Sequence, residues 1–181
     1  MNILLGVTGG ISAYKAADII GALKKYEHNI KVIMTNRAKD FITPLTLATL
    51  SKNPVYDDQT EWAPHGRIDH IELPKWADVF VIAPATANTL AKMAQGIADN
   101  LLTSAYLAYD KTKPVIYCPA MNNKMYENDR TTKNLQTIEK CPNHFRVGPE
   151  TGLLACGDFG IGKIASTKAI VDAVNIFSNK R

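Results

Sequence analysis

Residues 2–26 read NILLGVTGGISAYKAADIIGALKKY, and this stretch decides the fold. It opens as a short apolar run, passes at once through Gly9 and Gly10, and continues from Ile11 to Tyr26 with apolar residues at helical spacing. An apolar strand that turns through glycines into a helix is typical of the start of a βαβ unit. The pattern therefore predicts a strand at residues 2–8 and a helix at residues 11–26.

The same alternation of strand and helix continues along the chain. Further strands are predicted at residues 30–34, 78–83, 115–118 and 145–147, and helices at residues 46–50, 86–95, 97–106, 129–140 and 167–177. The run at 78–83 is apolar on both faces, which is typical of a strand buried inside a parallel sheet. The alternation predicts an α/β fold: a Rossmann-like, doubly wound parallel sheet in a three-layer sandwich.

Length and composition exclude several classes of protein. The chain has 181 residues, which suits one domain over residues 1–181. Its composition, with 46% hydrophobic and 21% charged residues, argues against long disordered segments. The apolar runs are too short for a membrane span, and the N-terminus lacks a signal-peptide pattern. The net charge of +4 comes from scattered lysines, which permits an anionic ligand without favouring nucleic acid.

Cysteine usage points to a reducing compartment. Cys118, Cys141 and Cys156 are an odd number with no metal-binding spacing. They favour neither a disulfide framework nor a zinc site, so we expect no metal and a cytoplasmic location. Cys118 lies inside an apolar strand and is expected to pack there.

In a doubly wound sheet, ligands bind at the carboxyl ends of the strands. After the first strand, backbone amides of Gly9, Gly10 and Ile11 could approach an anion, although a tight turn without a ligand explains them equally well. After the second strand, Thr35 could donate to a phosphate, or it could belong to a solvated helix start.

The loops after the third and fourth strands carry uncharged polar groups. Residues 86–89 are Thr86, Ala87, Asn88 and Thr89. Thr86 can cap a helix, but the further amide and hydroxyl suit a heteroaromatic ring or a phosphate rather than a metal. After the fourth strand, Asn122 offers both a donor and an acceptor for a carboxylate or an amide, or forms an ordinary Asx turn.

Two further residues are candidates for chemistry. His70 precedes the strand at 78–83 and is either structural or catalytic, whereas His28, His65 and His144 are interpreted as surface or loop residues. Cys156 lies in a segment with glycines at 157, 160 and 162, which predicts a mobile loop. A cysteine on a loop that closes over a site is a candidate acid or nucleophile.

Taken together, these segments resemble the flavin-containing cysteine decarboxylases, in the branch that acts on phosphopantothenoylcysteine. The motifs that carry the resemblance are GGISAYK (9–15), HIEL (70–73), PATANT (84–89), DNLLT (99–103), PAMN (119–122) and ACGD (155–158). They occur in the family's order and extend over nearly the whole chain, from residue 6 to about residue 164.

The resemblance implies a set of residue roles. FMN would be bound without covalent attachment by Gly9, Gly10, Ile11, Thr35 and residues 86–89, with Ala120 near its ring. His70 would be the active-site histidine, Asn122 would bind the substrate carboxylate and Cys156 would donate a proton. The family forms homotrimers or trimer-based assemblies with FMN at subunit interfaces.

The implied activity is decarboxylation of 4'-phosphopantothenoylcysteine to 4'-phosphopantetheine in coenzyme A biosynthesis, by thiol oxidation, loss of carbon dioxide and reduction of the enethiolate. One departure is Gly162-Lys163-Ile164, where the family usually has Gly-Arg-Met, and a lysine lacks the bidentate fork of arginine. Many bacterial relatives continue into a phosphopantothenate–cysteine ligase domain, which makes a separate ligase a candidate partner.

Three other functions are compatible with the scaffold. A peptidyl-cysteine decarboxylase is the nearest alternative, although the cysteine-bearing segment at 153–164 favours the coenzyme A branch. A flavin prenyltransferase is not expected to combine Asn122 with Cys156. A regulatory flavoprotein that inhibits a phosphatase usually carries acidic tails or altered catalytic residues, and neither is present here.

Overall fold

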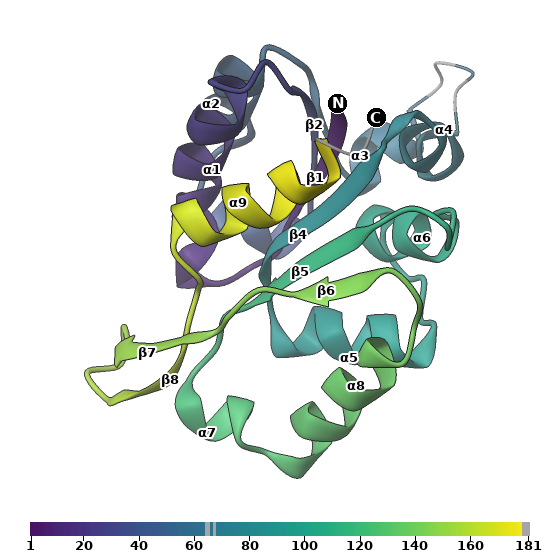
Figure 1. Cartoon of the computed structure of the whole chain (residues 1–181). Coiled ribbons are helices and arrows are strands. Elements are labelled where there is room, and N and C mark those ends of the chain that lie inside the picture. Colours follow the sequence, from purple (N-terminus) through teal and green to yellow (C-terminus); the bar gives the residue numbers. More distant parts are fainter. Residues whose placement is uncertain (64–65, 67, 179–181) are drawn as a thin grey trace.

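The computed structural model describes residues 1–63, 66 and 68–178, and its centre is a parallel sheet (Figure 1). The strands are β1 (Asn2–Val7), β2 (Asn29–Met34), β3 (Val55–Tyr56), β4 (Val79–Ala85), β5 (Val115–Pro119) and β6 (His144–Arg146). Their order is β3-β2-β1-β4-β5-β6, and all neighbouring pairs are parallel. This order confirms the doubly wound fold and places a ligand crevice at the switch point between β1 and β4.

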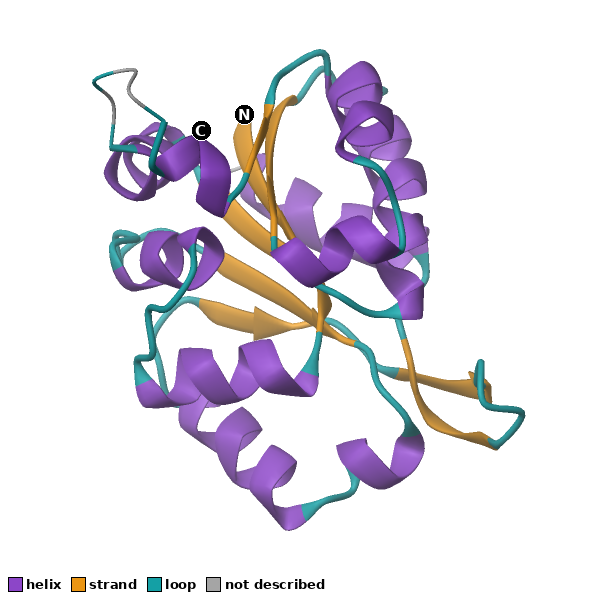
Figure 2. Cartoon of the chain, turned by 180° about the vertical axis from the view of Figure 1, so that it is seen from behind, coloured by secondary structure: helices purple, strands orange, loops and turns teal. Residues whose placement is uncertain are grey.

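Helices cover both faces of the sheet, as Figures 1 and 2 show. One face is covered by α1 (Lys15–Lys24), α2 (Pro44–Ser51) and α9 (Thr167–Ser178), and the other by α4 (Asp69–Trp76), α5 (Ala87–Gln95), α6 (Leu101–Leu107) and α8 (Asp129–Glu139). Short helical turns are η1 (Ile11–Tyr14), η2 (Asn36–Asp40), α3 (Asp58–Glu61) and α7 (Asn123–Tyr126). Within β1, Ile3 and Leu5 enter one core and Leu4 the other, because successive strand side chains point to opposite faces.

The segment predicted as a mobile loop around Cys156 is mostly a β-hairpin that projects from the sheet (Figure 1). Its strands are β7 (Glu150–Leu153) and β8 (Phe159–Lys163), so Gly160 and Gly162 are strand residues rather than loop hinges. At Gly162 the φ angle is +143°, and a Cβ there would lie 2.1 Å from the Met121 carbonyl oxygen. Glycine is required because it lets the hairpin backbone lie directly against the loop after β5, where Met121 N donates to Gly162 O at 3.0 Å.

Two of the predicted element boundaries are wrong for reasons that single contacts explain. The strand β4 does not stop before Pro84 but reaches Ala85; proline cannot donate a ladder hydrogen bond, so the register shifts there and pairing resumes one residue later. The helix predicted from residue 97 begins at Leu101, because Asn100 accepts from Thr103 N and caps the helix at that point.

The structure also places the remaining histidines and the buried cysteine. His28 is buried rather than exposed, because α9 packs over it and Asn175 Oδ1 lies 3.0 Å from its Nε2. His144 belongs to β6, and His65 lies outside the described residues. Cys118 is fully buried, as predicted, and this burial raises the pKa of its thiol. Among the residues described, no helix is both long enough and apolar enough to span a bilayer.

Candidate cofactor and substrate site

A cavity of about 1130 Å³ opens where β1, β2, β4 and β5 end, and the β7–β8 hairpin borders it. The sequence-predicted residues that line it are Gly9, Gly10, Ile11, Thr35, Thr86, Ala87, Asn88, Thr89, Ala120, Asn122 and Cys156. Pockets for small ligands typically measure about 300–1,000 Å³, so this cavity has room for a cofactor together with a substrate.

Gly9 allows the loops after β1 and β2 to touch. A Cβ on Gly9 would lie 2.3 Å from Arg37 Cβ and 2.7 Å from the Arg37 carbonyl carbon, which no side chain permits. Beside this contact, the hydroxyl of Thr35 is buried and has no hydrogen-bond partner within the described chain. A buried hydroxyl is normally satisfied, so Thr35 fits a ligand oxygen such as that of a phosphate.

Replacing Gly9 with alanine should therefore disturb the cavity and lower stability. The new methyl group forces the two loops apart, and overpacking of this kind costs about 1–3 kcal/mol. We expect a lower midpoint of thermal unfolding and weaker flavin binding, measured by calorimetry and by titration of the apoprotein. Gly21→Ala is the control, because a Cβ at Gly21 meets nothing within 4 Å and should not lower the midpoint. Unchanged stability and flavin affinity in Gly9→Ala would contradict the close approach.

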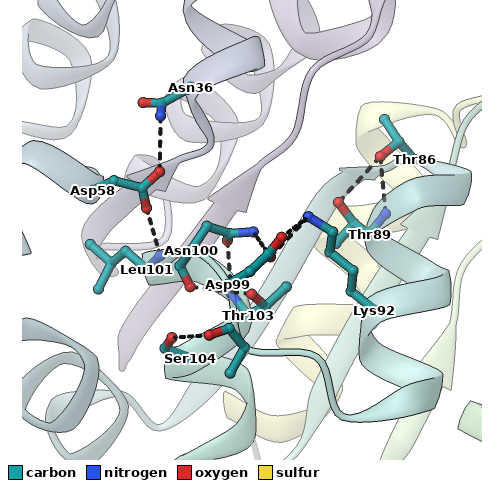
Figure 3. A network of polar contacts seen from close by, with 11 residues as sticks. Asn36, Asp58, Thr86, Thr89, Lys92, Asp99, Asn100, Leu101, Thr103 and Ser104 are labelled. Carbon is teal, nitrogen blue, oxygen red and sulfur yellow. Dashed lines mark hydrogen bonds and ion pairs between the residues drawn. The ribbon is translucent and has the colours of Figure 1, made fainter.

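The loop after β4 is held in place by Thr8, a residue that the sequence reasoning missed. The Thr8 hydroxyl donates to Pro84 O at 2.7 Å and accepts from Thr86 N at 3.1 Å. Thr86 Oγ1 in turn accepts from Thr89 N at 3.3 Å, so Thr86 caps α5 (Figure 3). Asn88 is exposed and lines the cavity, which leaves its amide facing the space for a ligand.

A second polar network supports the rim of the cavity (Figure 3). Asp58 accepts from Asn36 Nδ2 at 3.0 Å and from Leu101 N at 2.7 Å, which joins the β2 loop to the start of α6. Lys92 Nζ lies 2.8 and 2.7 Å from the two carboxylate oxygens of Asp99, and this hydrogen bonding holds the pKa of Asp99 below its ordinary value. Asp99 begins the DNLLT motif, to which the sequence analysis gave no structural role.

Asn122 and Cys156 come together although they lie 34 residues apart. Asn122 Nδ2 donates to Cys156 Sγ at 3.2 Å, and the thiol donates to Asp158 Oδ2 at 3.5 Å. Asn122 Oδ1 accepts from Lys124 N at 2.9 Å, so the predicted Asx-type turn is present as well. Because its oxygen is committed to the backbone, Asn122 offers the cavity its NH₂ group, which is a donor suited to a carboxylate.

His70 does not join the other predicted residues in this chain. It lies in the first turn of α4 and is not among the described residues that line the cavity. Its backbone N donates to Glu61 Oε2 at 3.1 Å, and its Nδ1 is hydrogen-bonded to Glu61 Oε1. No sequence motif singled out Glu61, because only the packing of α3 against α4 brings the two residues together.

Comparison with protein families agrees with a flavin site and covers almost the full length of the chain. The family model described as Flavoprotein matches residues 1–178. The chain belongs to this flavoprotein family. It is 47% identical, over 96% of both chains, to a probable phosphopantothenoylcysteine decarboxylase of Streptococcus mutans. It is also 44% identical to the coenzyme A biosynthesis bifunctional protein CoaBC of Vibrio vulnificus, covering 94% of this chain but only 42% of that larger protein.

Solved structures of flavoprotein decarboxylases have the same fold. A cysteine-to-serine mutant of PPC decarboxylase complexed with pantothenoylaminoethenethiol has a TM-score of 0.90 at 34% identity, covering 99% of this chain and 98% of that one. The FMN-binding protein AtHal3 has a TM-score of 0.87 at 34% identity, covering 99% and 97%. The peptidyl-cysteine decarboxylase EpiD, at 23% identity and a TM-score of 0.82, shows a shared fold only.

FMN is the cofactor that the family and these structures support. The residues of this chain fit it, because the unpartnered Thr35 hydroxyl and the backbone of Gly9, which packs closely against Arg37, both line the cavity at the β1 and β2 ends and suit a phosphate. The uncharged polar side chains of Thr86, Asn88 and Thr89 line the same cavity, and they suit either a heteroaromatic ring or a phosphate, the two alternatives that the sequence predicts.

Proposed function

We propose that this chain decarboxylates 4'-phosphopantothenoylcysteine to 4'-phosphopantetheine in coenzyme A biosynthesis, as a cytoplasmic carboxy-lyase. The contact between Asn122 and Cys156, at 3.2 Å on the wall of a flavoprotein cavity, carries the proposal. The relative from Streptococcus mutans supports it through its name. The solved PPC decarboxylase supports it through its ligand, an ethenethiol, which is unsaturated beside the sulfur.

The cofactor residues divide by the part of FMN that they suit. Thr35 and the backbone of Gly9, Gly10 and Ile11 would hold the phosphate. Thr86, Ala87, Asn88, Thr89 and Ala120 would surround the ring. When bound, FMN supplies a reversible two-electron acceptor, so the substrate thiol can be oxidised before carbon dioxide is lost and the electrons can then be returned.

The residues beside the hairpin would act on the substrate itself. Asn122 donates hydrogen bonds to the carboxylate from an uncharged amide, which orients the group without the strong ionic stabilisation that would oppose its departure. Cys156 then delivers a proton to the carbon of the enethiolate, because its sulfur lies 3.2 Å from Asn122 Nδ2, next to the group that binds the carboxylate. The hairpin at 150–163 borders this part of the cavity and would keep water from it once substrate is bound.

We further propose that His70 acts in the cavity of a neighbouring copy, in a homotrimer. Beside the Glu61–His70 pair, Trp62 is 83% exposed and Ile68 is 55% exposed. The cavity rim carries its own exposed apolar residues, including Ile11 and Leu153. Two different apolar surfaces on one chain can pair head to tail, and such contacts close into a ring of three when the rotation between successive copies is a third of a turn. Analytical ultracentrifugation tests this, and a monomer that turns over substrate would rule it out.

The function is tested by incubating the yellow holoprotein with 4'-phosphopantothenoylcysteine and measuring carbon dioxide and 4'-phosphopantetheine by mass spectrometry. A peptide that ends in cysteine is the parallel substrate, because a peptidyl-cysteine decarboxylase would process it preferentially. If only the peptide releases carbon dioxide, the proposed substrate is wrong and the chain is a peptidyl-cysteine decarboxylase. If the purified protein is colourless and binds no added FMN, the proposed enzyme function is refuted.

Replacing Asn88 with aspartate should weaken retention of FMN. The carboxylate removes the amide donor and adds a negative charge at the wall of a cavity that receives an anionic ligand. We expect at least about a tenfold rise in the dissociation constant of FMN, which corresponds to about 1.4 kcal/mol. Fluorescence titration of the apoprotein measures it, and full flavin occupancy after purification would show that this loop does not contact FMN.

A further inference from the structure

We propose that Glu61 is a positioning residue that fixes the tautomer of His70, leaving Nε2 without a hydrogen and open to accept a proton. This inference rests on the proposed function, because it gives His70 of that reaction a defined acceptor atom. It assigns to Glu61 a role that neither the motifs nor the cavity residues indicate.

The geometry of the pair is that of a carboxylate holding an imidazole from one side. The Glu61 side chain is only 8% exposed, whereas that of His70 is 36% exposed. Oε2 accepts from the backbone N of His70 at 3.1 Å, and Oε1 is hydrogen-bonded to Nδ1. An ionised carboxylate is an acceptor only, so the hydrogen must lie on Nδ1.

This arrangement decides whether the second ring nitrogen, Nε2, carries a hydrogen. In a neutral imidazole with its hydrogen on Nδ1, Nε2 is a bare acceptor. No hydrogen bond joins Nε2 to another residue in the described part of the chain. Nε2 is therefore a free base on a side chain that is 36% exposed. The exposed Trp62 and Ile68 lie between Glu61 and His70 in the sequence, in the surface assigned above to the neighbouring copy.

A purely structural tie between α3 and α4 would not need both bonds. The bond from the His70 backbone to Oε2 already joins the two helices. The bond to the ring also removes the rotational freedom of the imidazole, which joining the two helices does not require. Keeping a carboxylate at 8% exposure also carries a desolvation cost, so a side chain that it orients is a better explanation than a surface ion pair.

The proposed step is a single proton transfer. The S–H bond of the substrate cysteine breaks, its electron pair stays on sulfur, and the proton forms the N–H bond at His70 Nε2. Glu61 stays ionised and stabilises the imidazolium that results, as a buried carboxylate does beside a catalytic histidine in other enzymes. When the proton leaves again, the same carboxylate restores the starting tautomer.

Glu61→Gln is the decisive variant, because it keeps the shape of the side chain but reverses one polar atom. Its single carbonyl oxygen can accept from the His70 backbone N, and its NH₂ group then faces Nδ1 and donates to it. The ring hydrogen must then move to Nε2, which abolishes the acceptor. Wrong-tautomer variants of this kind lose up to about 10⁴-fold in kcat, so we expect a fall of at least about 100-fold.

Ring-nitrogen NMR of the histidine-labelled holoprotein measures the tautomer directly, with His70→Asn to identify the signal. The parent should show the Nδ1–H form and Glu61→Gln the Nε2–H form, with FMN content unchanged. Glu27→Gln, at an exposed glutamate, is the control and should alter neither the tautomer nor kcat.

The outcomes separate this inference from the proposed function. An Nε2–H tautomer in the parent would overturn the inference without any variant, even if Glu61→Gln failed to fold. The inference would also be overturned if Glu61→Gln kept the Nδ1–H tautomer, or if it changed to the Nε2–H tautomer and retained the full kcat. Correct tautomers in a parent that does not decarboxylate the substrate would instead refute the proposed function and leave the positioning of His70 standing.

Discussion

Replacing Cys156 with serine should stop the proposed reaction after carbon dioxide has left but before the final product forms. The Cys156 thiol is held next to Asn122, where its S–H group can release a proton to carbon. A serine hydroxyl is a much weaker acid. The hydroxyl can still accept from Asn122 Nδ2, so the hairpin should keep its place.

Mass spectrometry of the product tests this prediction. A species two hydrogens lighter than phosphopantetheine should accumulate, and formation of phosphopantetheine should slow by at least about 100-fold, as expected when a general acid is removed. Cys141→Ser is the matched control, because Cys141 is half-buried, lies outside the cavity lining and donates to Thr137 O. Phosphopantetheine at the parent rate would show that Cys156 is not the acid, and failure to release carbon dioxide would place its role earlier.

Replacing His70 with asparagine should abolish decarboxylation and leave a folded, yellow protein. The amide of asparagine can take the place of Nδ1 as a donor to Glu61, so the buried carboxylate keeps a partner. FMN should be retained, because His70 does not line the cavity of its own chain. Loss of a proton acceptor predicts a fall in carbon dioxide release of about 10²–10⁴-fold.

His144→Asn is the control for this variant, because His144 is tied to Tyr106 and to Pro142 O, away from the cavity lining. Normal turnover in His70→Asn would return His70 to a structural role. A mixture of the His70→Asn and Cys156→Ser proteins, dissociated and reassembled together, tests whether a site uses two chains. Equal random mixing should restore activity in about a quarter of the sites if it does, and no activity should return if each chain works alone.

The fold and most of the cavity lining follow from the sequence for a local reason. Apolar runs at 2–8, 30–34, 78–83 and 115–118 predict strands, and each reappears within a few residues as β1, β2, β4 or β5. Parallel strands all end at the same edge of a sheet, so the residues that follow them must share one site. The predicted residues after all four strands do line one cavity.

Element ends were harder to predict, because they depend on single side-chain contacts. Proline usually ends a strand, yet β4 continues through Pro84 because Ala85 pairs with Pro119. Residues 97–100 continue a helical pattern, but the hydrogen bond from Thr103 N to Asn100 Oδ1 begins α6 only at Leu101. Each of these boundaries is decided by the free energy of about one hydrogen bond, roughly 1 kcal/mol. The periodicity of apolar residues in the sequence does not reveal differences that small.

The sequence by itself determined the doubly wound sheet, the loops that form the site and the residue types suited to a flavin and a carboxylate. Only the tertiary structure decided which side chains meet: Asn122 with Cys156, Glu61 with His70, and His28 with α9. It also placed His70 outside the cavity of its own chain. The reason is that hydrophobic periodicity is encoded over neighbouring residues, whereas these contacts depend on how separate elements pack across the whole core.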